Sequence, residues 1–427
     1  MRQPSTKERS LRGALALAGV VAVVACADSE ARPLPVLSGA TLIESGASNP
    51  TVATSSNGVA YVAWVANTDA GSDVLFSKAM PGEGFTSPIR VNDIPGDAAP
   101  HAQAPAQVVA GPGDDVYVLW QNRTDVEWLD FGASDVRFSR STDGGLTWSP
   151  AITVNDNDAD TPARNTFHDM TVAEDGTILV SWIDARVRDG YRGEVYRATG
   201  TVPAVEEEPG TEIRVARSAD GGVSFSPSIV LETNSCPCCR TSIATGPDGA
   251  VYVSYRKVYG DNIRDIAVAR SLDGGKTFEE PVRVHEDNWY IPGCPHAGAS
   301  LAVDAAGRVH VAWFTGNSDN PGAFYAVSED GARTCSAPTR LTPAGAVATT
   351  QVAVAADESS TVWVAWEEPA GAQPRVALAR VSEGGDLERV DVGNAVGLVP
   401  ALDASDPALV LGWLEGESVK VVRTAAP

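Results

Sequence analysis

The sequence predicts an all-β fold assembled from a repeated unit, and two recurring patterns carry this prediction. The first is a short alternation of apolar and other residues that ends in an aromatic residue, such as VAYVAW at residues 59–64. Alternation with a period of two in Val, Tyr and Trp is typical of strands, whereas helical periodicity is essentially absent. Copies of the pattern end at Trp64, Trp120, Trp182, Tyr255, Trp313, Trp366 and Trp413.

The second pattern is a tight turn of the form SxDGG, followed three residues later by an aromatic residue. It runs as STDGGLTW over residues 141–148, SADGGVSF over 218–225 and SLDGGKTF over 271–278, with weaker copies at 328–335 and 382–387. The Asp carboxylate can accept backbone N–H groups across such a turn, and paired glycines permit a positive φ. We therefore expect a hairpin turn close to the end of most units.

These turns resemble the Asp-box, or BNR repeat, of the sialidase-like β-propellers. The resemblance implies a single propeller of four-stranded blades, with the Asp-boxes between third and fourth strands on the face away from the ligand site. Spacings of roughly 50 to 75 residues between the aromatic-ended strands fit such blades. Seven copies favour seven blades, and a six-bladed ring like that of the family's sialidases is the alternative. Residues 35–45 would supply the missing fourth strand of the last blade and close the ring.

Residues 1–25 have the pattern of a secretion signal. Four basic residues between positions 2 and 12 precede an apolar run that is too short to span a bilayer. The run ends in VVAC at Cys26, which resembles a bacterial lipobox whose cysteine is diacylated, and an ordinary signal peptide is the alternative. We expect residues 26–34 to form a lipidated tether and residues 35–427 to form the propeller. Ala27 follows the cysteine, and by the same resemblance the chain belongs on the outer membrane of a bacterial cell envelope.

The charge of the chain bears on its partners. Its formal net charge is −23, and removal of the signal, with its four basic residues and one acidic residue, would make it more negative. Nucleic acid is therefore excluded as an expected partner. Attachment to a membrane would rest on the lipid and not on a basic surface.

Cysteine and histidine cluster in three segments that lead into successive units. FHD spans residues 167–169, CPCC residues 236–239 and CPH residues 294–296. Propeller topology would bring such segments to one face, so we predict a single cluster at the mouth of a central funnel. Soft donors of this kind suit Cu(I) or Zn(II), whereas in an oxidising envelope disulfides or a free redox thiol are the alternatives. The candidates are His168, Cys236, Cys238, Cys239, Cys294 and His296.

A second set of candidates follows from the same topology. In sialidases, by resemblance, three arginines hold the substrate carboxylate, a Tyr–Glu pair acts as nucleophile and an Asp acts as acid and base. An arginine fork matches a carboxylate, and the segments near the predicted mouth offer arginines and one Asp. The family's Arg-Ile-Pro motif has no match here, and no nucleophilic tyrosine can be named. The ligand-binding candidates are Asp169, Arg123, Arg186, Arg240 and Arg256.

Two functions of different classes follow from these observations. The favoured one is a lipid-anchored accessory propeller that binds a ligand or a metal through a funnel lined by Cys, His and Arg. The alternative is a glycoside hydrolase of the exo-sialidase type. A carbohydrate or protein ligand fits either class, and the sequence assigns no catalytic residue.

Overall fold

A computed structural model divides the chain into two units, Met1–Leu34 and Pro35–Pro427. The predicted signal peptide and the Cys26 lipidation site lie outside the residues that the structure describes. Among the described residues, no helix is long and apolar enough to cross a membrane. The described residues are 1, 34–158, 160–345, 351–369, 373–382, 385–406 and 408–424.

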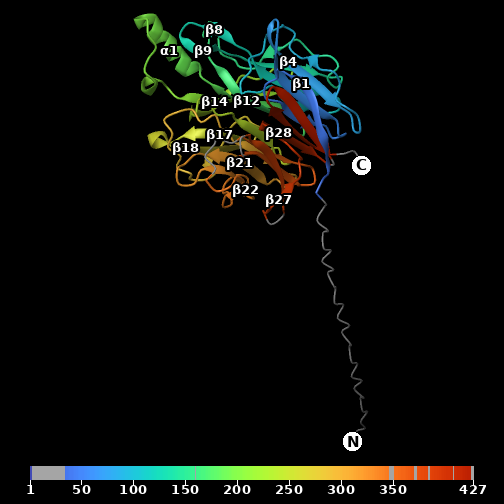
Figure 1. The fold of residues 1–427 in the computed structure, drawn as a ribbon. Coiled ribbons are helices and arrows are strands. Elements are labelled where there is room, and N and C mark those ends of the chain that lie inside the picture. Colours follow the sequence, from blue (N-terminus) through green and yellow to red (C-terminus); the bar gives the residue numbers. More distant parts are fainter. Residues whose placement is uncertain are drawn as a thin grey trace. The chain divides into compact units, whose positions relative to one another are not determined.

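The unit Pro35–Pro427 folds largely into antiparallel sheets of four strands (Figure 1). Three sheets follow chain order from first to fourth strand. They are β2 (Thr51–Thr54), β3 (Ala60–Thr68), β4 (Gly71–Ala79) and β5 (Ile89–Arg90); β20 (Ser300–Val303), β21 (Val309–Thr315), β22 (Gly322–Ser328) and β23 (Thr339–Arg340); and β24 (Val352–Ala356), β25 (Val362–Glu368), β26 (Arg375–Val381) and β27 (Leu387–Val390).

A fourth sheet carries an inserted hairpin between its second and third strands. Its strands are β6 (Gln107–Ala110), β7 (Val116–Gln121), β10 (Val136–Ser141) and β11 (Ile152–Thr153), and the hairpin is β8 (Thr124–Val126) with β9 (Leu129–Ala133).

Eight further strands form one larger sheet that consists of two sets of four. The two sets are joined where Ser235 at the end of the first set pairs with Lys257 of the second. This junction immediately precedes the CPCC segment. The strands are β12 (Asn165–Val172), β13 (Ile178–Asp184), β14 (Thr211–Ser218) and β15 (Ile229–Ser235), then β16 (Ser242–Thr245), β17 (Val251–Val258), β18 (Arg264–Ser271) and β19 (Val282–Arg283).

The remaining sheet joins the two ends of the unit. Strand β1 (Leu37–Ser45) pairs antiparallel with β30 (Ser418–Thr424), and β29 (Ala408–Glu415) and β28 (Leu398–Ser405) complete the sheet. In Figure 1 the blue strand β1 accordingly lies beside the red C-terminal strands.

The first strands of successive sheets lie next to one another. Strand β2 contacts both β6 and β28, and the contacts continue from β6 through β12, β16, β20 and β24 to β28. These strands surround a cavity of about 400 Å³, the central cavity, whose lining includes Asp169, Arg240 and Asp403. The architecture is therefore all-β and propeller-like.

The aromatic residues that end the predicted strands form the core. All seven lie in the second strand of a sheet and are buried to 2% exposure or less, from Trp64 in β3 to Trp413 in β29. Each second strand is covered on both faces because the neighbouring sets of strands pack against the two faces of its set. Burial of large aromatic side chains contributes much of the driving force for such packing.

The SxDGG turns have the hydrogen bonds expected from their sequence. Asp143 Oδ1 accepts from the backbone N–H groups of Leu146 and Thr147 at 3.0 and 2.9 Å, and Ser141 Oγ donates to the same oxygen at 2.7 Å. Equivalent bonds surround Asp220, Asp273 and Asp330. Residues 383–384 of the weak fifth copy lie outside the described residues.

The sequence shows no helical periodicity, but the described part of the chain contains a helix. Helix α1 (Arg186–Thr199) follows β13 and ends at Gly200 with φ 76°, and two 3₁₀ turns, η1 (Val205–Glu207) and η2 (Gly260–Asn262), occur elsewhere. The helix has no apolar stripe, and ion pairs hold it in place instead. Asp189 is fully buried against Arg164, and Arg192 pairs with Glu208 at 2.8 Å.

Candidate metal centre

The CPCC segment connects β15 to β16 and is fixed to two neighbouring sets of strands. The backbone N–H of Cys236 donates to the carbonyl oxygen of Arg256 in β17 at 2.8 Å. The backbone N–H of Thr241, just after the segment, donates to the carbonyl oxygen of Phe167 in β12 at 3.1 Å. These bonds hold the loop on both sides, and Cys236, Cys238 and Cys239 are buried.

Five of the six predicted ligands lie in two overlapping groups. The inner group is Cys236, Cys238 and Cys239, and the outer group is Cys238, Cys294 and His296. Within each group the donor atoms all lie within 4.8 Å of one another. The inner group is buried, whereas Cys294 and His296 are exposed. The arrangement offers four thiols and one imidazole in a single cluster.

The sulfur atoms of the cluster are not bonded to one another. Cys236 Sγ lies 3.7 Å from both Cys238 Sγ and Cys239 Sγ, far beyond an S–S bond of about 2.05 Å. The described cysteines, with Cys335 of the fourth turn among them, are free thiols. In this structure the thiols of the cluster are free, which is the form that can bind metal.

Hydrogen bonds lower the pKa of two of the four thiols, and hydrogen bonds and burial raise the pKa of the other two. Bonds from Cys238 and Cys239 lower the pKa of Cys236 well below its ordinary value, and Arg264 acts in the same direction. A bond from Cys238 lowers the pKa of Cys294 to about 7. Burial raises the pKa of Cys239 to about 12, and bonds to its neighbours raise the pKa of Cys238. One inner and one outer sulfur are thus favoured as thiolates.

Arginine and glutamine side chains surround the cluster. Arg264 Nη1 donates to Cys236 Sγ at 3.4 Å and to the carbonyl oxygen of Gly293 at 2.5 Å, which ties the inner group to the segment that carries Cys294. Gln351 Nε2 donates to the carbonyl oxygen of His296 at 2.9 Å. Gln103 Nε2 in turn donates to Gln351 Oε1 at 2.8 Å. The sequence did not single out these three side chains because strand pairing, and no local spacing, brings them here.

Two further histidines, His101 and His168, belong to neither group. His168 is fully buried, and its Nε2 lies 3.1 Å from the carbonyl oxygen of Pro105. Burial lowers its pKa to about 4, so it is neutral. The structure therefore separates His168 from the predicted ligand set. The ring of His101 lies 5.8 Å from that of His296, between centroids.

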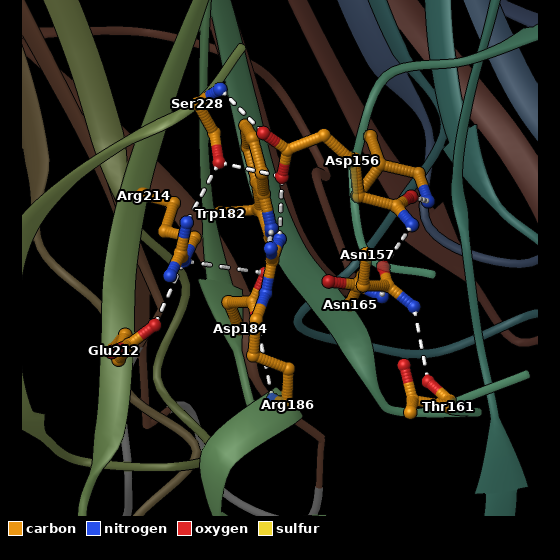
Figure 2. A network of polar contacts seen from close by, with 12 residues as sticks. Asp156, Asn157, Thr161, Asn165, Trp182, Asp184, Arg186, Glu212, Arg214 and Ser228 are labelled. Atoms are coloured by element: carbon orange, nitrogen blue, oxygen red, sulfur yellow. Dashed lines mark hydrogen bonds and ion pairs between the residues drawn. The ribbon is translucent and has the colours of Figure 1, made fainter. Parts of the chain in front are cut away.

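Arg186, at the start of α1, forms ion pairs with two carboxylates of this chain. Figure 2 shows buried Asp184 between the side chains of Arg186 and Arg214, which contact it at 2.7 and 3.7 Å. Arg186 also contacts Asp156 at 2.7 Å, and Trp182 Nε1 donates to Asp184 at 3.1 Å. These carboxylates occupy the guanidinium that a substrate carboxylate would need.

Two other predicted arginines are held in different surroundings. Arg123 contacts Asp125 at 3.5 Å, and both side chains are largely exposed. Arg256 is buried and donates to the carbonyl oxygens of Ala297 and Phe314, each at 2.8 Å. Each arginine thus has its own partners, and no shared carboxylate site is formed from Arg123, Arg186 and Arg256.

Asp169 and Arg240 lie together on the wall of the central cavity. Asp169 Oδ2 accepts from the backbone N–H of Ile243 at 3.0 Å. Burial raises the pKa of Asp169 and lowers that of Arg240, although each charge favours the other. Since Arg240 directly follows Cys239, the cavity begins beside the inner group.

Comparison with known proteins shows the fold. No protein-family model and no curated protein matches the chain. A Hadza microbial sialidase is similar at 13% identity over 86% of this chain and 76% of that chain, with a TM-score of 0.50. A PL25 ulvan lyase bound to its saccharide is similar at 11% over 92% and 96%, with a TM-score of 0.57. A Penicillium chrysogenum α-L-arabinanase complexed with arabinobiose is similar at 13% over 92% and 99%, with a TM-score of 0.50. The chain therefore has a sialidase-like fold.

Proposed function

We propose that this protein is a lipid-anchored propeller of the bacterial cell envelope that binds a soft metal ion, Cu(I) or Zn(II), at the thiol–imidazole cluster. The observation that carries the proposal is the convergence of Cys236, Cys238, Cys239, Cys294 and His296 within two overlapping groups of donor atoms. Thiolate and imidazole donors select these ions over Mg²⁺ or Ca²⁺.

The position of the cluster supports binding of an ion from solution. Exposed Cys294 and His296 stand at the surface, and the buried inner thiols lie behind them. An ion can therefore be captured by exposed donors and held by buried ones. The Arg264 guanidinium beside Cys236 stabilises thiolate, the form that binds metal.

The architecture we infer is a ring of seven blades. The contacts of the first strands run from β2 through β6, β12, β16, β20 and β24 to β28 and back to β2. Strand β1 supplies the fourth strand of the last blade, which removes the exposed edges of an open array. The four described SxDGG turns are Asp-boxes in this interpretation. The mouth with the cluster then lies on the opposite face.

The glycoside hydrolase alternative has weaker support. Its main support is the fold, and one fold hosts many chemistries. Tyr255 and Glu232 form one Tyr–Glu pair, with oxygen atoms 3.1 Å apart, but Tyr255 is fully buried. A buried phenol cannot reach a sugar. A carbohydrate or protein ligand at the mouth is compatible with the accessory role.

The test is metal binding by the reduced chain without its signal segment. We expect Cu(I) and Zn(II) to bind at equimolar amounts or more under anaerobic conditions, measured by competition with a chromogenic chelator and by elemental analysis. The Cys236→Ser/Cys239→Ser variant, which removes two of the three inner donors, should bind less metal than the unchanged chain, whereas Cys335→Ser, which changes a cysteine outside the cluster, should bind as much. Absence of binding by fully reduced, folded protein would refute the proposal. A parallel assay with a fluorogenic sialoside should show no turnover, and turnover would favour the hydrolase.

A further inference from the structure

The two ligand groups of the cluster share one sulfur. Cys238 belongs to the inner group with two buried cysteines and to the outer group with Cys294 and His296. A cluster built around one ion would have all its donors around one centre. Here the five donors fall into two groups whose atoms lie within 4.8 Å of one another, and Cys238 belongs to both.

The separations within the inner group fit a bound ion. Cys236 Sγ lies 3.7 Å from both of its partners. For a metal–sulfur bond of about 2.3 Å, sulfurs around a tetrahedral ion lie about 3.8 Å apart and those around a planar trigonal ion about 4.0 Å apart. The two separations that involve Cys236 are already near these values, and the third lies within 4.8 Å, so an ion can bind with little movement.

The number of donors decides between ions. Five donor atoms serve two centres, so each centre has three ligands only because Cys238 is counted twice. Structural Zn(II) sites are closed by four protein ligands, whereas Cu(I) is a soft ion for which thiolates are favoured ligands and three are sufficient. Trigonal sites with a bridging thiolate are therefore suited to Cu(I).

The balance of charge favours the same ion. The two cations that act on the inner thiols are Arg264 and Arg256. The charge of Arg188 lowers the pKa of Cys294, but Arg188 is already neutralised by its ion pair with Glu208. Four thiolates are neutralised by two monovalent ions together with Arg264 and Arg256, whereas two divalent ions would leave excess positive charge. Buried charge is costly unless it is compensated.

We propose that the inner and outer groups each bind one Cu(I) ion and that the Cys238 thiolate bridges the two ions. This inference rests on the metal-binding function proposed above and extends it to a defined stoichiometry. Binding leaves all four sulfurs as thiolates and releases the protons of those that were still thiols, with no change of oxidation state. The outer ion, held by exposed donors, exchanges with solvent ligands, and the inner ion is retained.

The experiment is an anaerobic titration of the reduced chain with Cu(I), followed through a competing chromogenic chelator, X-ray absorption and proton release. We expect two equivalents of Cu(I), release of protons as they bind, and a copper–copper vector in the absorption spectrum. The Cys294→Ser/His296→Ala variant changes only exposed residues, so it should fold and bind one equivalent without the copper–copper vector. Cys335→Ser should behave as the unchanged protein.

The outcomes separate this inference from the function on which it rests. Binding of a single equivalent by the unchanged protein, or two equivalents by Cys294→Ser/His296→Ala, would overturn the bridged pair and leave metal binding intact. A single tight Zn(II) ion that resists displacement by Cu(I) would also overturn it. Failure to bind either ion would overturn both proposals.

Discussion

We expect Gly145→Ala to destabilise the protein because a methyl group at this position would overlap the ring of Phe76. Gly145 is the second glycine of the first SxDGG turn and has φ 81°. A Cβ atom there would lie 2.2 Å from Cε1 and 2.6 Å from Cζ of Phe76. Phe76 belongs to the preceding sheet and is 1% exposed, so its ring cannot move aside freely.

The expected loss of stability in Gly145→Ala has two contributions. A residue with a Cβ atom in the left-handed region costs about 1–2 kcal/mol. Overlap with a buried ring adds about 1–3 kcal/mol, as over-packing of a core does. The matched control is Gly144→Ala, which has φ 68° but would place its Cβ atom 3.0 Å from Nζ of Lys78, the end of a flexible side chain. The control should therefore show only the first contribution.

The chain itself contains a comparison for this prediction. In the fourth turn the same place is taken by Ala332, which has φ 63°. Ala332 is buried in a cluster that includes Val268, where the chain has the smaller Val instead of a Phe. A methyl group is thus accommodated at this place in the fourth turn.

The assay is unfolding by denaturant and by heat, followed by tryptophan fluorescence. Gly145→Ala should lower the midpoint more than Gly144→Ala does, and truncation of the ring in Gly145→Ala/Phe76→Leu should recover part of the difference in a double-mutant cycle. Equal effects of the two alanine variants, with no coupling to Phe76, would refute the steric explanation.

Three further predictions concern other parts of the chain. Asp403 accepts two hydrogen bonds from Thr54, and burial raises its pKa to about 6. The free energy of unfolding should therefore fall as pH rises from about 4 through about 6. Asp403→Asn should raise the free energy of unfolding by about 1–3 kcal/mol at pH 7 and leave it unchanged at pH 4. A pH-independent difference would contradict this. Hydrogen bonds from Ser224 lower the pKa of Asp220, so Asp220→Ala should lower the melting temperature at pH 7, with a difference that shrinks below about pH 4, while Cu(I) binding persists; loss of binding with an unchanged melting temperature would reverse the assignment of faces. Cys26→Ser should abolish partitioning into detergent and change the mass of the processed chain, and unchanged values would rule out lipidation.

The sequence was sufficient for the repeating elements of the fold. The strands that contain Trp64, Trp182 and Trp413 were predictable because period-two alternation and an aromatic residue at a fixed place are local properties of a strand. The turn at Asp143 was predictable because its donors lie within a few residues of the carboxylate. Helix α1 was not predictable because buried ion pairs with distant residues, such as that of Asp189 with Arg164, hold it.

Some features of the candidate site were likewise predictable from the sequence, and others were not. The sequence by itself determined which donors exist and that the CPCC and CPH segments lead into neighbouring units, and this was enough to predict that Cys294 and His296 lie in one cluster with cysteines of the CPCC segment. Only the tertiary structure decided that His168 turns away to the carbonyl of Pro105. The structure also decided that Arg264 reaches Cys236 and that Cys238 belongs to two ligand groups. The physical reason is that spacing along the chain fixes which loops converge, whereas side-chain direction within a loop depends on hydrogen bonds and packing supplied by other sheets.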